Sequence, residues 1–505
     1  MSKLNRSCAA EANSPGISLR QLLPEARFIG AKDLRVQAVS ADSRNCQRGD
    51  IFVALVGTRA DGHEHVEEAI ARGASAVVVE RLLPGDFPQC VVDDARIAFG
   101  QICQALAGNP SQSLKVIGVT GTNGKTTTSC LIASILQAAG FEPGLLGTLG
   151  YCDGLAIEDA PLTTPAAPVL ADRLARMAAN GCTHAVMEAS SHALAQHRTA
   201  GVTFDAVCVT NVRRDHLDYH GSLVAYREAK RRLFDQLAPE GFAVVNADDP
   251  VCTSYLAGFS GAALTVGIHE PAEITAALVD RSASEQTFLL HAGSETVSVR
   301  TQMIGDHHIS NCLVAAAVGL VYGIDLHDIV RGLEAIDHVP GRLERIECGQ
   351  PFAAFVDYAH TPDALACTLK TLRETTAGKL ICVFGAGGDR DRPKRPLMGR
   401  MVEQLADAAI VTTDNPRTED PAAIVRDILA GVEQPEEFEV VCDRRAGIRR
   451  ALSLAAPGDC VVIAGKGHEN YQIVGTDRQS IDDRQIVRDW LYKHAEPSKF
   501  CRPAA

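Results

Sequence analysis

The sequence of 505 residues is 46% hydrophobic and 22% charged, which is typical of globular proteins and unlike disordered chains, collagens or coiled coils. Its 62 acidic and 49 basic residues give a formal net charge of -13, which argues against a protein that coats nucleic acid with a basic surface. At about 150 residues per domain, this length predicts about three folded units.

Neither a membrane span nor an export signal is expected. The longest apolar run, residues 313–323, is too short to cross a bilayer, and the first sixteen residues lack a continuous apolar stretch. The sixteen cysteines are scattered and form no C-x-x-C pair, which is typical of buried thiols in a reducing compartment. The sequence therefore predicts a cytoplasmic protein without membrane insertion.

The first predicted domain covers residues 1–112. Short apolar runs at 50–57 and 74–80 alternate with helical stretches, which indicates a small α/β unit, and the turn-rich segment 108–113 ends it. The second domain, residues 113–342, begins with a strand at 114–119, a glycine-rich loop and an apolar helix. Strand, glycine loop and helix in this order are the phosphate-binding arrangement.

The third predicted domain covers residues 343–505. Strand candidates alternate with helical stretches as far as Trp490, which is typical of a doubly wound parallel sheet; the candidates are residues 352–359, 379–388, 407–413, 439–442 and 460–467. The predicted fold class is therefore α/β, in three domains.

The loop GTNGKTTT at 121–128 carries the strongest single signal. Its glycines let backbone N–H groups approach phosphate oxygens, Lys125 bridges the β- and γ-phosphates, and the Thr126 hydroxyl faces Mg²⁺. Val119 stands where the strict P-loop pattern has its first glycine, so this loop is a shortened variant. The motif predicts a nucleoside triphosphate site.

Two polar segments follow strand candidates of the same domain, MEASSHALAQHR at 187–198 and NVRRDHLDYHG at 211–221. Glu188 and His216 stand in them as a carboxylate and an imidazole near the ends of neighbouring strands, where both suit Mg²⁺ beside a triphosphate. The local pattern of Lys230, by contrast, is that of an ordinary solvated lysine.

In the last domain four polar loops each follow a strand candidate, at 357–365, 385–396, 414–417 and 465–469. Loops after parallel strands share one edge of the sheet, so we expect a second ligand there. Arg390 and Arg417 suit carboxylates because a guanidinium offers two parallel donors, and Glu469 suits an ammonium group.

Together, GTNGKTT, MEASSHALAQHR, NVRRDHLDYHG, DYAHTPDAL, GGDRDRPKRPLMG, DNPRTE and GKGHENYQ resemble the motifs of the Mur ligase family, from ADSR at 41–44 to the last helix. The resemblance implies an N-terminal UDP-substrate domain, a central P-loop-type ATPase domain with a parallel sheet, and a C-terminal Rossmann-like domain that binds the amino acid. It implies an ATP-dependent amide ligase of peptidoglycan precursor synthesis that works through an acyl phosphate. Within the family, DNPR favours the branch that adds meso-diaminopimelate to UDP-N-acetylmuramoyl-L-alanyl-D-glutamate.

The resemblance also implies the roles of individual residues. Catalysis would involve Lys125, Glu188, His216 and Lys230, the last as a carbamate formed with carbon dioxide. The residues for ATP would be Gly121, Thr122, Asn123, Gly124, Lys125, Thr126, Thr127, Asn311 and Arg342, and those for two Mg²⁺ ions Thr126, Glu188, His216 and Lys230. The UDP-substrate would contact Ser43, Thr58, Arg59, Ala60, Thr163, Thr164, Ser190, Gln196 and Arg198. Diaminopimelate would contact Arg390, Asp414, Asn415, Pro416, Arg417, Gly465 and Glu469.

Several alternatives stay open at this point. A sister ligase would add L-lysine or D-alanyl-D-alanine, a folylpolyglutamate synthase would lack the UDP domain, and a P-loop switch or motor would hydrolyse ATP without an amino acid. A noncatalytic binding module is a further alternative. Leu162 and Arg213 depart from the family pattern, which has asparagine and a smaller residue there. The protein is expected to be a monomer.

Overall fold

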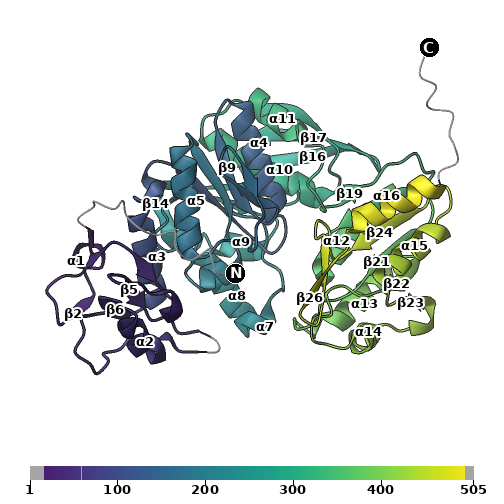
Figure 1. Ribbon diagram of the computed structural model, residues 1–505. Helices are drawn as coiled ribbons and strands as arrows, with labels where there is room; N and C mark the ends of the chain where they lie inside the picture. Colours follow the sequence, from purple (N-terminus) through teal and green to yellow (C-terminus); the bar gives the residue numbers. More distant parts are fainter. Residues whose placement is uncertain (1–15, 58–59, 495–505) are drawn as a thin grey trace, which may run out of the picture.

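The computed structural model describes residues 16–57 and 60–494, and these form three α/β domains in a row (Figure 1). The predicted three-domain α/β fold is confirmed. None of the described helices has the length and hydropathy to cross a bilayer. The cysteines of the described part are all free thiols. The predicted limits after residues 112 and 342 stay predictions.

The N-terminal domain (purple in Figure 1) is a small sheet with helices packed against it. Its elements are β1 (Ile17–Ser18), α1 (Leu19–Leu22), β2 (Arg27–Ile29), β3 (Arg35–Val36), β4 (Val39–Ser40), β5 (Ile51–Val53), α2 (Val66–Ala71), β6 (Ala76–Val79), β7 (Gln89–Val91) and α3 (Ala95–Leu106). The main sheet has the order β2-β7-β6-β5-β4, and its strands are parallel except for β2. The apolar runs at 50–57 and 74–80 contain β5 and β6, as expected.

The central domain is built on an eleven-stranded sheet. Its elements are β8 (Lys115–Thr120), α4 (Lys125–Ala138), β9 (Pro143–Gly147), β10 (Gly150–Cys152), β11 (Ile157–Glu158), α5 (Ala167–Ala179), β12 (His184–Glu188), α6 (Ser191–Ala195), β13 (Phe204–Val209), α7 (Leu217–His220), α8 (Leu223–Arg231), β14 (Leu237–Asn246), α9 (Pro250–Ser254), β15 (Ala262–Gly267), β16 (Ile274–Arg281), β17 (Gln286–Ala292), β18 (Glu295–Thr301), α10 (Asp306–Val321) and α11 (Leu326–Glu334).

The strand order of this sheet is β11-β10-β9-β12-β8-β13-β14-β15-β16-β17-β18. The parallel part of the sheet comprises β9, β12, β8, β13, β14, β15 and β16. The strands β10 and β11 extend one edge in antiparallel pairing, and β17 and β18 extend the other. One apolar core lies under α4, α10 and α11, and a second lies on the opposite face under α5 and α8. Glu188 of β12 pairs with Val119 of β8, and Val209 of β13 pairs with Thr120, so the three polar loops leave one edge of the sheet together.

The C-terminal domain (green to yellow in Figure 1) is a doubly wound sheet, as predicted. Its elements are β19 (Glu344–Arg345), β20 (Ala353–Asp357), α12 (Pro362–Thr375), β21 (Leu380–Phe384), α13 (Lys394–Leu405), β22 (Ala408–Val411), α14 (Pro421–Leu429), β23 (Phe438–Val440), α15 (Arg444–Leu454), β24 (Cys460–Ala464), β25 (Tyr471–Val474), β26 (Asp477–Ser480) and α16 (Asp483–His494).

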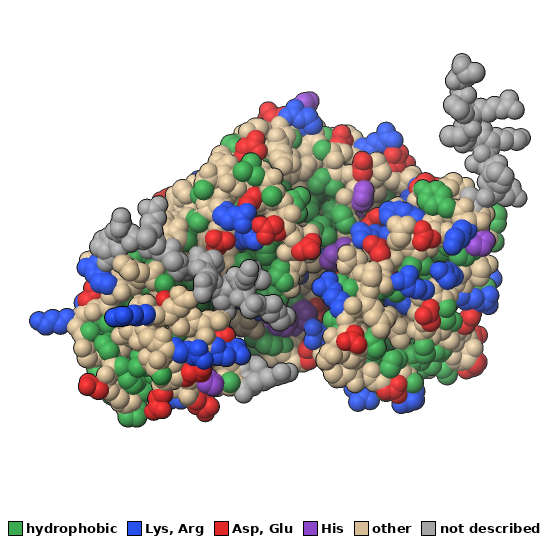
Figure 2. Space-filling model, viewed as in Figure 1, with side chains coloured by type: hydrophobic (Ala, Val, Ile, Leu, Met, Phe, Trp, Pro, Cys, Tyr) green, Lys and Arg blue, Asp and Glu red, His purple; other side chains and the backbone are tan. Residues whose placement is uncertain are grey.

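Its main sheet has the order β19-β20-β24-β21-β22-β23. All of these strands are parallel except β19, which pairs with β20 in antiparallel orientation. The helices α12, α13 and α14 cover one face, and α15 and α16 cover the other. The loops after β20, β24, β21 and β22 therefore share the carboxyl edge of the sheet. In Figure 2 the surface is hollowed where the central and C-terminal domains meet, and histidine side chains are visible inside the hollow.

Candidate functional site

The glycine loop between β8 and α4 is held in a conformation that only glycine allows at two positions. Gly124 has a φ of +85°, and a Cβ added there would lie 2.3 Å from Oδ1 of Asn311. A Cβ on Gly121 would lie 1.9 Å from Oγ1 of Thr210. The backbone N–H groups of Thr122 and Asn123 donate to the carbonyl oxygen (2.8 Å) and Oδ1 (2.9 Å) of Asn211. The loop is thus fastened to the segment after β13 and leads directly into the N-terminus of α4, a position suited to phosphate.

Two lysine side chains converge on this loop. Nζ of Lys125 donates to the carbonyl oxygens of Gly121 and Thr122, both at 2.9 Å, and Nζ of Lys230 donates to that of Gly121 at 2.6 Å. Lys230 is only 1% exposed, so the interpretation of it as a solvated lysine is wrong. Burial, and then the charge of Lys125, hold the pKa of Lys230 well below its usual value. Its amine is therefore far more readily neutral than that of a surface lysine.

Glu188 ends β12 as a carboxylate that is 1% exposed. It accepts hydrogen bonds from Oγ1 of Thr126 (3.0 Å) and from the backbone N–H (2.7 Å) and Oγ1 (3.1 Å) of Thr148. A Cβ on Gly147 would come within 2.3 Å of Oε1 of Glu188, so a glycine is needed at the end of β9. These donors are all neutral, and a buried carboxylate with neutral partners is suited to a cation.

His216 precedes α7 in the left-handed conformation, with a φ of +53°. Its Nε2 lies 3.3 Å from Oδ2 of Asp215, and its ring lies 4.6 Å from that of His192 in a T-shaped contact. Burial outweighs the attraction of Asp215 and lowers the pKa of His216 to about 3. The imidazole is therefore neutral at physiological pH, which is the state that binds metal ions.

The two outlying residues predicted for ATP lie against the same loop. Oδ1 of Asn311, on α10, accepts from Oγ1 of Thr128 at 3.2 Å and closes the space beside Gly124. Nη2 of Arg342 donates to Oγ1 of Thr126 at 3.3 Å, while its guanidinium lies 4.3 Å from the ring centroid of Tyr358. Arg342 thus connects the glycine loop to the first loop of the C-terminal sheet. Thr127 is buried within α4.

The residues predicted for the muramoyl peptide gather beside Glu188. Oγ1 of Thr164 donates to the Glu188 carbonyl (2.7 Å) and accepts from the Ser190 N–H (3.0 Å). The hydroxyl oxygens of Thr163 and Thr148 lie 3.1 Å apart. Arg198 donates through Nη1 to the Thr164 carbonyl (3.0 Å) and through Nη2 to Oε1 of Gln196 (2.7 Å).

The positions that depart from the family pattern have simple surroundings. The side chain of Leu162 is exposed, and its carbonyl accepts from the Tyr151 hydroxyl at 2.5 Å. The side chain of Arg213 is half exposed, and its backbone N–H donates to Oγ1 of Thr122 at 2.8 Å. Neither side chain forms a described contact with Lys125, Glu188 or His216.

The residues predicted for the uridine nucleotide lie in the N-terminal domain. Ser43, in the short 3-10 helix Ser43–Asn45, donates through Oγ to Oε2 of Glu68 at 2.8 Å. Ala60 is exposed. Thr58 and Arg59 lie outside the described residues.

The residues predicted for diaminopimelate meet at the carboxyl edge of the C-terminal sheet. Nδ2 of Asn415 donates to Oε2 of Glu469 at 3.0 Å, and Nη1 of Arg417 donates to the Gly388 carbonyl at 2.6 Å. Nη1 of Arg390 donates to the Asp389 carbonyl at 3.0 Å. Pro416 is buried, and a Cβ on Gly465 would come within 2.7 Å of Oδ2 of Asp414.

This part of the site brings together charges of both signs. Burial, and then the charge of Arg390, lower the pKa of Arg417, so the two guanidinium groups lie close enough to repel. Burial raises the pKa of Asp414, but the charges of Lys466 and Arg444 outweigh it and leave the pKa below its usual value. Asp414 and Glu469 offset part of this lowering at Arg417, so cationic and anionic groups lie near each other here.

The central and C-terminal sites face each other across the domain junction. Nε of Arg214 lies 3.8 Å from Oδ2 of Asp391. Burial raises the pKa of Asp215, but the charges of His216, His360 and Lys394 have the larger effect and lower the pKa to about 2. His360 and Lys394 belong to the C-terminal domain, so both domains contribute charge at this junction.

Several residues of these networks were not predicted from the sequence, among them Thr148, Asn211, Tyr226 and Lys466. Thr148 fastens Glu188, Asn211 fastens the glycine loop, and the Tyr226 hydroxyl lies 2.9 Å from Oγ1 of Thr122. Asn211 and Lys466 stand inside motifs already noted. Thr148 and Tyr226 carry no local signal.

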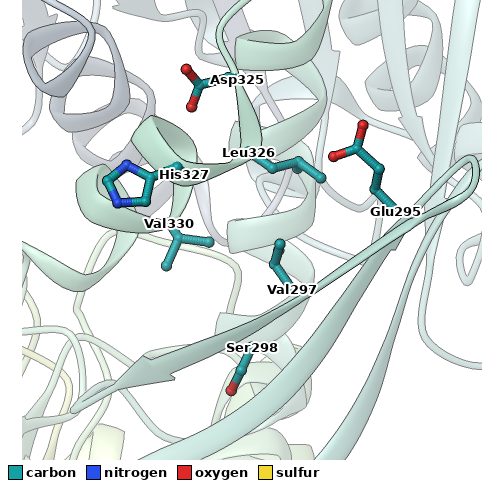
Figure 3. A pocket seen from close by; sticks show the side chains of 7 residues that line it. All are labelled: Glu295, Val297, Ser298, Asp325, Leu326, His327 and Val330. Carbon is teal, nitrogen blue, oxygen red and sulfur yellow. The ribbon is translucent and has the colours of Figure 1, made fainter.

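A hollow of about 570 Å³ lies on another face of the central domain, between β18 and α11 (Figure 3). It is lined by Glu295, Val297, Ser298, Asp325, Leu326, His327 and Val330. In the described part of the chain, Asp325, His327 and Asp328 are the one group of three acidic, histidine or cysteine side chains with ligand atoms within 4.8 Å of each other. None of these residues belongs to the predicted site.

Comparison with known proteins gives consistent matches along the chain. Three family profiles match: "Mur ligase family, catalytic domain" over residues 35–96, "Mur ligase middle domain" over 119–319 and "Mur ligase, glutamate ligase domain" over 341–467.

Individual relatives match over most of their length. UDP-N-acetylmuramoyl-L-alanyl-D-glutamate–2,6-diaminopimelate ligase of Geobacillus kaustophilus is 42% identical over 90% of this chain and 94% of its own. The enzyme of the same name from Synechococcus elongatus is 43% identical over 91% and 94%. A solved structure of a ligase of this name is 35% identical, with a TM-score of 0.68, and the match covers 95% of this chain and all of the other. The resemblance seen in the motifs is confirmed, and the chain belongs to the Mur ligase family.

Proposed function

We propose that this ligase joins meso-diaminopimelate to UDP-N-acetylmuramoyl-L-alanyl-D-glutamate at the expense of ATP. The observation that carries the proposal is the position of Arg342, which bonds to Thr126 of the glycine loop and lies over Tyr358 of the C-terminal domain. Arg342 thereby links the proposed phosphate site to the domain that carries Arg417 and Glu469. The high identity to enzymes of that name supports the same substrates.

The central site suits the activation of a carboxylate. A carboxylate and a triphosphate repel each other, so their approach requires cations. Lys125 at the loop and Arg342 at the domain junction supply two of them. The substrate carboxylate attacks the γ-phosphorus, ADP leaves, and an acyl phosphate forms. The amine of the incoming amino acid then attacks the acyl carbon, and phosphate leaves as the amide bond forms.

Mg²⁺ fits the residues at the end of β12. The buried Glu188 carboxylate has only neutral donors among its described partners, and the Thr126 hydroxyl bonds to it. We assign Thr126, Glu188 and His216, together with Lys230, to hold Mg²⁺. Bound there, the ion would neutralise phosphate charge. The remaining work of the chain is to orient the two substrates and to exclude water from the acyl phosphate.

Lys230 is assigned as a carbamate. Carbon dioxide reacts with a neutral amine, and burial lowers the pKa of Lys230 well below its usual value, which favours the neutral form. The product is a carbamate anion with oxygen atoms that suit Mg²⁺, and a proton is released. The positive charge of Lys125 disfavours the ammonium form of Lys230. The same charge would attract the negative charge of the carbamate.

The amino-acid site suits a diamino diacid better than lysine. The distal carboxylate of diaminopimelate offers Arg417 a bidentate partner, and its ammonium offers Glu469 one. L-lysine lacks that carboxylate and would leave Arg417 without a carboxylate partner, which is costly for a partly buried charge. We further propose that the ligase is a cytoplasmic monomer that takes UDP-N-acetylmuramoyl-L-alanyl-D-glutamate, diaminopimelate and ATP as substrates.

The proposal is tested by phosphate release with purified protein. Release is expected only when ATP, the UDP-linked dipeptide and meso-diaminopimelate are all present, and L-lysine should not replace diaminopimelate. With ¹⁸O in the dipeptide carboxylate, label should appear in the released phosphate. Lys125→Ala should abolish release without changing the circular dichroism spectrum. Rapid release without the amino acid would instead identify an ATPase switch.

A further inference from the structure

Lys466 is a lysine with no exposed surface, at the turn after β24. Its Nζ donates to Oδ1 of Asn415 at 3.1 Å and to Oε2 of Glu469 at 3.2 Å, and it lies 5.5 Å from the ring centroid of Tyr471. A lysine is rarely buried completely unless its charge is paired, because desolvation of an ammonium group is costly. The position of Lys466 is therefore determined by the groups to which it donates.

Asn415 completes a triangle with Lys466 and Glu469. Its Nδ2 donates to the same Oε2 of Glu469 at 3.0 Å, while its Oδ1 accepts from Lys466 and from the backbone N–H of Ile473 at 2.9 Å. Two donors at Oδ1 determine which way the amide is turned. In the described part of the chain, Oε2 of Glu469 thus receives two hydrogen bonds, and no residue donates to Oε1. One oxygen of this carboxylate is committed to the protein and the other is not.

Lys466 also supplies positive charge to a second carboxylate, that of Asp414. Its charge is the main influence that lowers the pKa of Asp414 against the effect of burial. The second cation near Asp414 is Arg444, which already forms a bidentate pair with Asp483 at 2.9 and 2.7 Å. Lys466 is thus a cation that contacts Glu469 and also acts on the charge of Asp414.

We propose that Lys466 is a positioning residue for the incoming diamino acid. It holds the Glu469 carboxylate so that Oε1 faces the substrate ammonium, and it holds the Asn415 amide in its orientation, without touching the substrate. This inference rests on the proposed function, because it concerns the substrate assigned to Glu469 and Arg417.

The test is a double-mutant cycle on steady-state kinetics. Lys466→Met keeps the length of the side chain but removes its charge and donors, so Glu469 becomes free to turn. The KM for diaminopimelate is expected to rise about 10- to 100-fold, while the KM for ATP changes less than about 2-fold. In a Glu469→Gln background the same change should raise this KM by a smaller factor, because the part of the effect that acts through Glu469 is already lost. Lys370→Met, at an exposed position on α12, is the matched control.

A second variant keeps the test decisive. Lys466→Arg retains the charge with displaced donors, so the KM for diaminopimelate should rise less than in Lys466→Met. An unchanged KM for diaminopimelate in both variants, equal effects on the KM values of diaminopimelate and ATP, or failure of both variants to fold would overturn the proposal. If the wild-type protein does not ligate diaminopimelate at all, the proposed function itself fails, and that result is distinct.

Discussion

Lys230 illustrates how burial determines the chemistry of a single residue. The sequence around it is typical of a helix with solvated lysines. In the structure, however, the Lys230 side chain is 1% exposed and donates to the Gly121 carbonyl. The sequence around it contains no sign of this, because the groups that bury it come from the glycine loop more than a hundred positions earlier. Only the family resemblance pointed to this lysine.

We predict that activity depends on carbon dioxide. Removing bicarbonate and carbon dioxide from the assay should lower the rate, and returning them should restore it. Lys230→Ala should lower kcat by about 100-fold or more, as expected for loss of a group that stabilises transition-state charge, and acetate should restore part of it. Equal rates of the wild-type protein with and without carbon dioxide would contradict the carbamate.

We predict that His184 makes the free energy of unfolding depend on pH. It is 4% exposed between the rings of Phe141 and Tyr322, and burial lowers its pKa to about 4. Above about pH 6.5 the residue is neutral in both the folded and the unfolded chain. As the pH falls from 6.5 to 4, the unfolded chain takes up a proton that the folded chain does not, so stability is lost, by up to about 3 kcal/mol.

The measurement is the free energy of unfolding in urea at pH 7 and pH 4.5. His184→Gln should lose less stability between these values than the wild-type protein does. His327→Gln, whose side chain is 84% exposed, serves as the control and should behave like the wild type. The same pH dependence in His184→Gln and in the wild-type protein would show that this imidazole does not titrate as described.

At the scale of elements, α4 is positioned by close contact with α11. A Cβ on Gly332 of α11 would lie 2.5 Å from the Cα of Ile135, and Oγ of Ser134 donates to the Gly332 carbonyl at 2.6 Å. The two helices therefore approach backbone to backbone, which a larger residue prevents. Because α4 begins at the glycine loop, this contact also determines where the phosphate site lies.

Gly332→Ala is accordingly expected to destabilise the protein by about 1–3 kcal/mol, although alanine is the better helix former. Chemical unfolding followed by circular dichroism measures the change. His327→Ala, an exposed change on the same helix, should be within about 0.5 kcal/mol of the wild type. A Gly332→Ala variant as stable as the wild-type protein would mean that α11 moves away from α4 without cost.

At the scale of the whole molecule, the last helix is fastened by a buried ion pair. The guanidinium of Arg444 and the carboxylate of Asp483, at the start of α16, are both fully buried, and Arg444 also donates to the carbonyls of Thr413 (3.2 Å) and Ala464 (3.0 Å). The pair thus connects α15, α16 and the two loops that carry Asp414 and Lys466. The stability of the C-terminal domain and the shape of the amino-acid site are linked through it.

Asp483→Ala should lower the free energy of unfolding by about 3–5 kcal/mol, because it leaves a buried guanidinium unpaired. Trp490 on α16 is the single tryptophan of the chain, so its fluorescence reports this transition. Replacing both partners, as Arg444→Met with Asp483→Leu, should recover most of the loss. A loss below about 1 kcal/mol in Asp483→Ala would show that solvent reaches Arg444.

The sequence by itself determined the α/β class, the three-domain organisation and the family. These depend on local signals: apolar runs such as 74–80 that become strands, and the spacing of glycines and a lysine at 121–125 that requires a strand before it and a helix after it. The order of strands and helices then places the polar loops at the carboxyl edges of two sheets, whatever the details of packing.

Tertiary structure alone decided burial, charge state and the partners of each side chain. Thr148 donates a hydrogen bond to Glu188, which lies forty positions away in the sequence, and Lys466 donates one to Asn415, which lies fifty-one positions away. No local pattern indicates such contacts, because they depend on where the two sheets place their loops. A pKa likewise depends on every group packed around a side chain, so the low pKa of Lys230 exists only once the glycine loop has folded over it.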